Sequence, residues 1–221
     1  MYLMEKVSND ISQKISAILE CDKEQTEIIA YGALVLIQTS IAFILILIVG
    51  ILLNVLYETV VISITAASLR KYSGGAHSAS PNRCAVMGAI IFNTIALATN
   101  SFFSSANAIT IVPFSAICFA FVYCILYRYC PVDSSNKPIN NVEFKKRLRK
   151  KSFYVTSIFL IISILLMIFY YINYNHVLLY TIICISLGLV WQALTLFYPG
   201  KFITYLLDSL LIKILCLRRW Q

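Results

Sequence analysis

Long apolar stretches, broken by short polar segments, are the feature that most limits how this chain can fold. Between Ala30 and Leu69 the only charged residue is Glu58. As one helix these residues would extend about 60 Å, twice the roughly 30 Å hydrocarbon thickness of a bilayer. A single straight helix would overshoot the membrane, so we expect two spans joined by a tight turn near Gly50.

The rest of the chain repeats this pattern. Ala85 to Tyr127 has the length of a second pair of spans, and 153–172 with 177–197 form a third pair. The 221 residues are 60% hydrophobic, whereas soluble domains average about 45–50%. We therefore expect an all-α polytopic membrane protein with about six transmembrane helices, within a range of four to six. Residues 1–221 would form a single integral membrane domain.

Amphipathic helices are expected at both ends of the chain. Residues 1–29 are polar, with apolar residues at helical spacing, which predicts an N-terminal amphipathic helix. This helix would lie in the membrane plane or pack on the protein's own cytoplasmic face. Residues 202–217 are apolar but interrupted by Asp208 and Lys213, and they are short for a span. They favour a second interfacial helix.

The charges indicate how the chain is oriented in the membrane. The formal net charge is +8, and Lys and Arg gather in 70–83, in the basic loop 128–152 and at the C-terminus. The turns near residues 50, 104 and 174 lack such charges, so the positive-inside rule places both termini and the basic loops in the cytoplasm. The same positive charge suits anionic membrane lipid or an acidic substrate. Nucleic acid is not an expected partner, because no nucleic-acid motif is found.

Residues 70–84, between the second and third spans, combine a thiol with an imidazole. Ser80 is a plausible helix N-cap and Pro81 suits the first helical position, so Cys84 would lie in the first turn of the next helix. A helix N-terminus and the adjacent Arg83 favour a thiolate, the reactive form of cysteine. His77 would lie in the preceding loop, where it could fold back to act as a base.

The same segment contains Gly74 and Gly75, which permit close backbone approach and could offer amide donors to an oxyanion. Cys130, next to Pro131 in the other basic loop, is the alternative thiol nucleophile. We expect no metal site and no cofactor, because the two histidines, His77 and His176, fall on opposite sides of the membrane in this topology.

The segment R-K-Y-S-G-G-A-H-S-A-S-P-N-R-C, Arg70 to Cys84, resembles the signature of the accessory gene regulator B (AgrB) family. These are membrane cysteine peptidases that process autoinducing-peptide precursors in Gram-positive quorum sensing. The later C-P-V-D-S-S-N-K-P-I resembles the second loop of that family. The resemblance implies that Cys84 is the nucleophile and His77 its general base, and that Arg70 and Gly75 are needed for a working site. Asp133 would orient His77 or form an Asx turn.

The resemblance also implies a substrate. An AgrD-like peptide would have an amphipathic leader, a ring-forming segment and an acidic C-terminal tail. Removal of the tail would leave an acyl-enzyme thioester, and an internal Cys or Ser of the peptide would then close a thiolactone or lactone. The basic residues that could bind the acidic tail are Lys71, Lys145, Lys146, Arg147, Arg149, Lys150 and Lys151.

A different function remains open at the level of the sequence. Glu58, Asn93, Asn100 and Gln192 fall within or beside the spans, where polar groups are expensive. They could line a path through a small transporter or peptide exporter, and one chain could also combine peptidase and exporter. For Glu58, the alternative is a position at the outer interface. The sequence does not decide whether the chain forms a homodimer.

Overall fold

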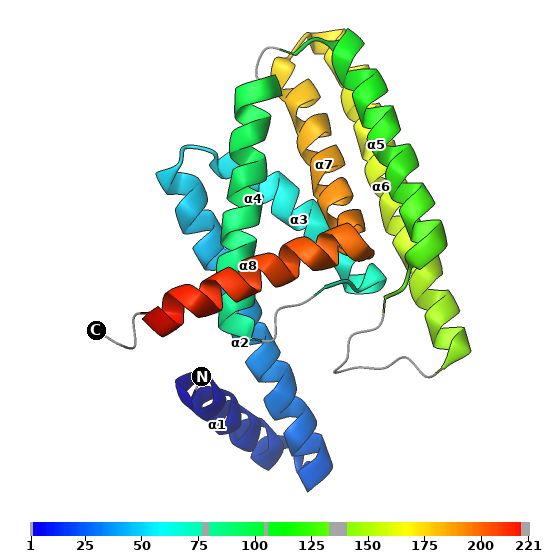
Figure 1. Ribbon diagram of the computed structural model, residues 1–221. Coiled ribbons are helices and arrows are strands. Elements are labelled where there is room, and N and C mark those ends of the chain that lie inside the picture. Colours follow the sequence, from blue (N-terminus) through cyan, green and yellow to red (C-terminus); the bar gives the residue numbers. More distant parts are fainter. Residues whose placement is uncertain (1, 77–79, 104–105, 133–140, 218–221) are drawn as a thin grey trace.

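The computed structural model describes residues 2–76, 80–103, 106–132 and 141–217, and within these ranges the chain is largely helical (Figure 1). The helices, in chain order, are α1 (Tyr2–Leu19), α2 (Lys23–Leu52), α3 (Leu56–Ser73), α4 (Pro81–Phe103), α5 (Ala108–Tyr129), α6 (Val142–Asn173), α7 (His176–Leu194) and α8 (Tyr198–Leu217). The predicted all-α class is confirmed.

Five of the helices in the described residues are long and apolar enough to cross a membrane: α2, α4, α5, α6 and α7. α3 occupies the place of the second predicted span but contains Glu58, Arg70 and Lys71 within its 18 residues. It packs against α2, α4, α6 and α7, which cover much of its surface. The chain is thus a multi-pass helical protein, in agreement with the predicted range of four to six spans.

α7 is the central helix of the bundle. Its sequence is apolar on every side, and it packs against α3, α5 and α6. A Cβ atom on Gly188 would lie 2.7 Å from the carbonyl oxygen of Ile62, so only glycine allows α7 to approach α3 this closely. The close packing fixes the C-terminal end of α3 beside the C-terminal end of α7.

The turn between α2 and α3 lies slightly later than predicted. α2 continues through Gly50 to Leu52, and Asn54 has a positive φ of 55° in the turn that follows. Glu58 therefore lies in the first turn of α3. This position at the end of a helix agrees with the alternative prediction, in which Glu58 lies at the outer membrane interface. It is nevertheless 8% exposed, and its carboxylate accepts a hydrogen bond from the Tyr180 hydroxyl at 3.0 Å.

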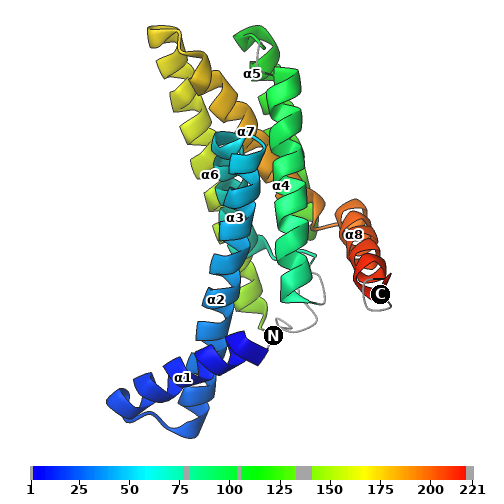
Figure 2. The ribbon, with the colours of Figure 1, turned by 90° about the vertical axis from the view of Figure 1, so that its left-hand side faces the viewer.

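The N-terminal segment differs from the predicted helix over 1–29. α1 ends at Leu19, and Asp22 begins α2 with a capping box in which Gln25 is the reciprocal partner. The first span therefore starts well before Ala30. Three serines of α1, at positions 8, 12 and 16, are buried, whereas Val7 and Ile11 on its apolar side are exposed. Figure 2 shows α1 beside the N-terminal end of α2. The apolar side of α1 is therefore free to contact lipid.

The second half of the basic segment 128–152 is helical, as its sequence favours. Asn141 caps α6, and the basic run Lys145–Lys151 forms the first turns of that helix. At the C-terminus, the interfacial helix predicted from Phe202 begins earlier, at Tyr198, as α8. Figure 1 shows α8 lying across the direction of α4 and α7.

Candidate functional site

Cys84 lies where the sequence predicts, in the first turn of α4. The helix begins at Pro81, and the Cys84 amide donates a hydrogen bond to the Ser80 carbonyl oxygen at 2.9 Å. The Cys84 residue is partly exposed, so a substrate carbonyl can reach it. The dipole of a helix favours negative charge in its first turn.

Arg70 connects the end of α3 to the segment that precedes Cys84. Its guanidinium donates to the carbonyl oxygen of Ala76, and its charge interacts electrostatically with Cys84. The structure therefore brings together two predicted site residues that are 14 positions apart. His77 and Asp133, the predicted base and second-loop residue, lie outside the described residues.

Gly74 and Gly75 form a turn at the end of α3, called here the Gly-Gly turn. Their φ angles are +72° and +132°, a conformation that side chains rarely adopt. A Cβ on Gly74 would lie 2.2 Å from the Val132 carbonyl oxygen, and one on Gly75 would lie 2.5 Å from Thr195 Oγ1. Both positions therefore need glycine.

The Gly74 amide is not available as an oxyanion donor. The Gly74 amide donates to the Arg70 carbonyl oxygen at 3.1 Å and so ends α3. Gly74 also forms a parallel β-bridge with Val132, whose amide donates to the Ser73 carbonyl oxygen at 2.9 Å. The Gly74 amide is therefore already bonded, and the prediction for it is wrong. The Gly-Gly turn instead allows close packing between the end of α3, the segment that contains Val132 and the end of α7.

The third of these segments is the end of α7, which sequence reasoning did not connect to the site. The side-chain amide of Gln192 donates to Ser73 Oγ at 3.1 Å and to the Gly74 carbonyl oxygen at 2.8 Å. The Ala76 amide donates to the Thr195 carbonyl oxygen at 3.1 Å. The available signal was a glutamine within an apolar span, which requires buried partners. From the sequence alone, this glutamine is equally consistent with a transport path.

Basic side chains from two helices meet beside this site. The ammonium groups of Lys71 and Lys151 lie 5.7 and 5.6 Å from the centre of the Tyr72 ring. The structure thus joins the first predicted tail-binding residue to the end of the basic run on α6. Arg149 instead donates to the Tyr127 carbonyl oxygen and stacks over the Tyr127 ring. The remaining residues of the predicted set, Lys145, Lys146, Arg147 and Lys150, are exposed on the same turns of α6.

Cys130, the alternative nucleophile, is less suited to the chemistry. It is 6% exposed, and its Sγ donates to Ser152 Oγ at 3.2 Å. Burial raises the pKa of the Cys130 thiol, which disfavours the reactive thiolate. Among the described His, Cys, Asp and Glu residues no group of three is arranged to bind a metal ion.

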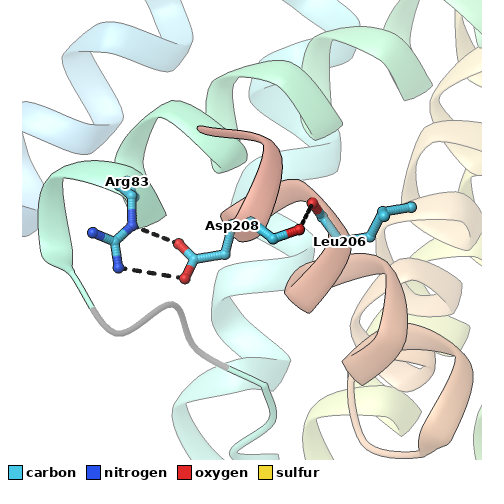
Figure 3. A network of polar contacts seen from close by, with 4 residues as sticks. Arg83, Leu206 and Asp208 are labelled. Carbon is cyan, nitrogen blue, oxygen red and sulfur yellow. Dashed lines mark hydrogen bonds and ion pairs between the residues drawn. The ribbon is translucent and has the colours of Figure 1, made fainter. Parts of the chain in front are cut away.

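α8 is attached to the start of α4 by an ion pair. Arg83 Nε and Nη2 donate to the two carboxylate oxygens of Asp208, at 2.7 and 3.3 Å (Figure 3). Both side chains are partly exposed. Arg83 immediately precedes Cys84 in the chain, so this contact places α8 next to the candidate nucleophile.

Reversing one charge of this pair should release α8. In Asp208→Arg, repulsion from Arg83 should raise amide hydrogen exchange in α8 roughly fivefold, because the attraction that holds the helix end is replaced by repulsion between like charges. The double variant Arg83→Asp/Asp208→Arg should regain most of the protection. Lys213→Glu, a charge reversal elsewhere on α8, is the matched control. Equal exchange in all variants would mean that the ion pair does not attach the helix.

Comparison with known proteins assigns the family. The accessory gene regulator B family matches residues 6–196. An AgrB-like protein of Clostridium perfringens strain SM101 is 42% identical over 96% of this chain and all of its own length. A second AgrB-like protein, from C. perfringens strain 13, is 39% identical with the same coverage. No solved structure matches the chain. The chain therefore belongs to the accessory gene regulator B family.

Proposed function

We propose that this protein is a membrane-embedded cysteine endopeptidase that removes the acidic tail of a small AgrD-like precursor and cyclises the remainder. Membership of the AgrB family supports a role in the accessory gene regulator system. The observation that carries the proposal is the position of Cys84, partly exposed in the first turn of α4 with the Arg70 charge nearby. This combination of helix terminus and cation is typical of activated thiols.

The proposed reaction has two acyl-transfer steps. The Cys84 thiolate attacks the carbonyl carbon that joins the ring segment to the tail, and the C–N bond breaks. His77 takes the thiol proton and returns it to the leaving amine, so the tail departs with a neutral or protonated amino group. The peptide remains on Cys84 as a thioester. An internal thiol or hydroxyl of the peptide then attacks this thioester, closing the ring and releasing Cys84 without an external energy source.

Arg70 has a supporting role in this proposal. Its bond to the Ala76 carbonyl oxygen fixes the backbone immediately before His77, and its positive charge interacts electrostatically with Cys84. Asp133 would orient His77 or form an Asx turn in the second loop. The site would face the cytoplasm together with both chain termini, because the basic clusters near it follow the positive-inside rule.

The acidic tail would bind beside the Tyr72 ring, where Lys71 and Lys151 converge. Replacing both lysines by glutamine should raise KM for an acidic-tailed peptide about fivefold, since each exposed charge contributes up to about 1 kcal/mol. Steady-state kinetics at low salt would measure this change. A peptide whose tail carboxylates are replaced by amides should show no such difference.

The matched control for this prediction is Lys6→Gln/Lys14→Gln, which removes the same charge from exposed positions on α1. An equal rise in KM in the control would mean that the loss of net charge, and not the loss of a specific tail-binding site, weakens binding of the peptide. An unchanged KM in Lys71→Gln/Lys151→Gln would mean that these basic residues do not bind the tail and serve only to orient the chain in the membrane.

Transport is the weaker proposal because Asn93 and Gln192, two of the buried polar residues that suggested it, have structural partners. Asn93 donates to the carbonyl oxygens of Ile46 and Ala89 and accepts from Thr59, so it ties α2, α3 and α4 together. Gln192 is bonded to Ser73 and Gly74. These side chains satisfy one another or the backbone rather than pointing into an open path.

The test uses the purified full chain in lipid vesicles with a synthetic precursor containing an internal cysteine and an acidic tail. Mass spectrometry should detect the free tail and a second product smaller by one water than the linear remainder, as thiolactone formation requires. Release of the tail with a linear remainder would support a peptidase without cyclase activity. An intact peptide after incubation would refute the proposal.

A further inference from the structure

Gln192 is a buried amide outside the predicted catalytic segment. It lies near the C-terminal end of α7, and only 1% of its surface is exposed. A polar side chain at such a position must find hydrogen-bond partners inside the protein. Both partners of its NH₂ group belong to the end of α3, at Ser73 and Gly74.

These two bonds determine the orientation of the Gly-Gly turn. The Gly74 carbonyl oxygen is 2.8 Å from Gln192 Nε2, and a Cβ on Gly75 would be 3.3 Å from the same nitrogen. Gln192 therefore holds the Gly74–Gly75 peptide in two ways, because it donates a hydrogen bond to the Gly74 carbonyl oxygen and packs against the α-carbon of Gly75. α7 provides a rigid support for this contact, because Gly188 locks it against α3.

The turn connects directly to the proposed catalytic groups. On one side is Arg70, whose guanidinium donates to the Ala76 carbonyl oxygen, and on the other the chain leads to Cys84. The Ala76 amide is bonded to Thr195, three residues after Gln192. The end of α7 thus contacts the backbone of the Gly-Gly turn at Gly74 and the backbone just after it at Ala76.

We propose that Gln192 is a positioning residue for the peptidase reaction, fixing the Gly-Gly turn so that Arg70 and Cys84 keep their relative placement. This inference rests on the proposed function. Gln192 would act through the turn and would not touch substrate. Losing it should slow the chemical step and leave tail binding at Lys71 and Lys151 intact, so kcat should fall while KM is unchanged.

The decisive variant is Gln192→Met, which keeps the length of the side chain and removes its donors. In the purified full chain with the synthetic precursor, kcat for tail release should fall about tenfold, with KM within about twofold of wild type. The control is Ser186→Ala. Ser186 lies on the same helix, is buried, and shares a 2.9 Å hydrogen bond with Ser115, so its loss perturbs packing away from the site.

A double-mutant cycle separates positioning from general destabilisation. Ser73→Ala removes one acceptor of Gln192, and it should reduce kcat by a smaller factor than Gln192→Met. In the Gln192→Met background, Ser73→Ala should add no further loss, because the contact is already absent. If Gln192→Met does not fold, Ser73→Ala alone tests the inference, because it should lower kcat at an unchanged KM.

The outcomes are distinguishable. If wild type releases no tail, the proposed function fails, and the inference fails with it. If wild type is active and Gln192→Met keeps its kcat, only the inference fails. A fall in kcat that Ser186→Ala reproduces, or that is additive with Ser73→Ala, would show a structural role and also overturn it.

Discussion

Replacing Cys84 by alanine should abolish both release of the tail and formation of the cyclic product. The substitution removes the proposed nucleophile, Cys84 Sγ, and losing a nucleophile lowers rates by roughly 10⁴-fold or more. The residue is partly exposed and its backbone bond to Ser80 does not depend on the side chain, so α4 should still form. Mass spectrometry of the peptide products measures both effects together.

Cys130→Ala is the control for this experiment, since it removes the alternative thiol. Its bond to Ser152 contributes to packing, so a modest loss of thermal stability is expected, but tail release should continue. The opposite result, activity in Cys84→Ala and none in Cys130→Ala, would move the nucleophile to the second loop.

Gly74→Ala should have the second-largest effect. An alanine would need a φ of +72°, and its Cβ would lie 2.2 Å from the Val132 carbonyl oxygen, a distance that real Cβ atoms do not show. Because the obstacle is backbone, the turn or the Val132 segment must move. A displacement of about 1 Å near reacting groups lowers rates about 10²-fold, so kcat/KM should fall by that order.

Gly32→Ala is the matched control, because no atom lies within 4 Å of the added Cβ. Gly32 lies within α2, where alanine is the better helix former, so stability should be unchanged or higher. We therefore expect a lower kcat/KM and a lower unfolding temperature in Gly74→Ala than in Gly32→Ala. Equal activity in Gly74→Ala and Gly32→Ala would show that the Gly-Gly turn is not needed for the reaction.

Local signals in the sequence predicted much of this arrangement. The alternation of apolar and basic segments predicted the helical membrane class, and Ser80 with Pro81 predicted where α4 begins and hence the first-turn position of Cys84. The break after α1 was also readable, since Asp22 and Gln25 have the spacing of a capping box. The helical periodicity of residues 1–29 instead favoured one continuous helix, so this break was not predicted.

The contacts that assemble the site could not be derived in this way. Gln192 is 118 positions from Gly74, and Lys151 reaches the Tyr72 ring from another helix. Such pairings depend on how α3, α6 and α7 pack, and periodicity within one helix carries no information about its neighbours. Likewise, the sequence shows that Gly74 permits close approach but not that its amide already ends α3.

The most direct test of the account traps the acyl-enzyme. The precursor is synthesised with its internal cysteine replaced by alanine, so the ring cannot close after the tail leaves. Incubation with the full chain, followed by digestion and mass spectrometry, should show the Cys84 peptide carrying the leader and ring segment through a bond that hydroxylamine cleaves. Tail release with the adduct on another cysteine, or with no adduct under conditions that preserve thioesters, would contradict Cys84 as the nucleophile.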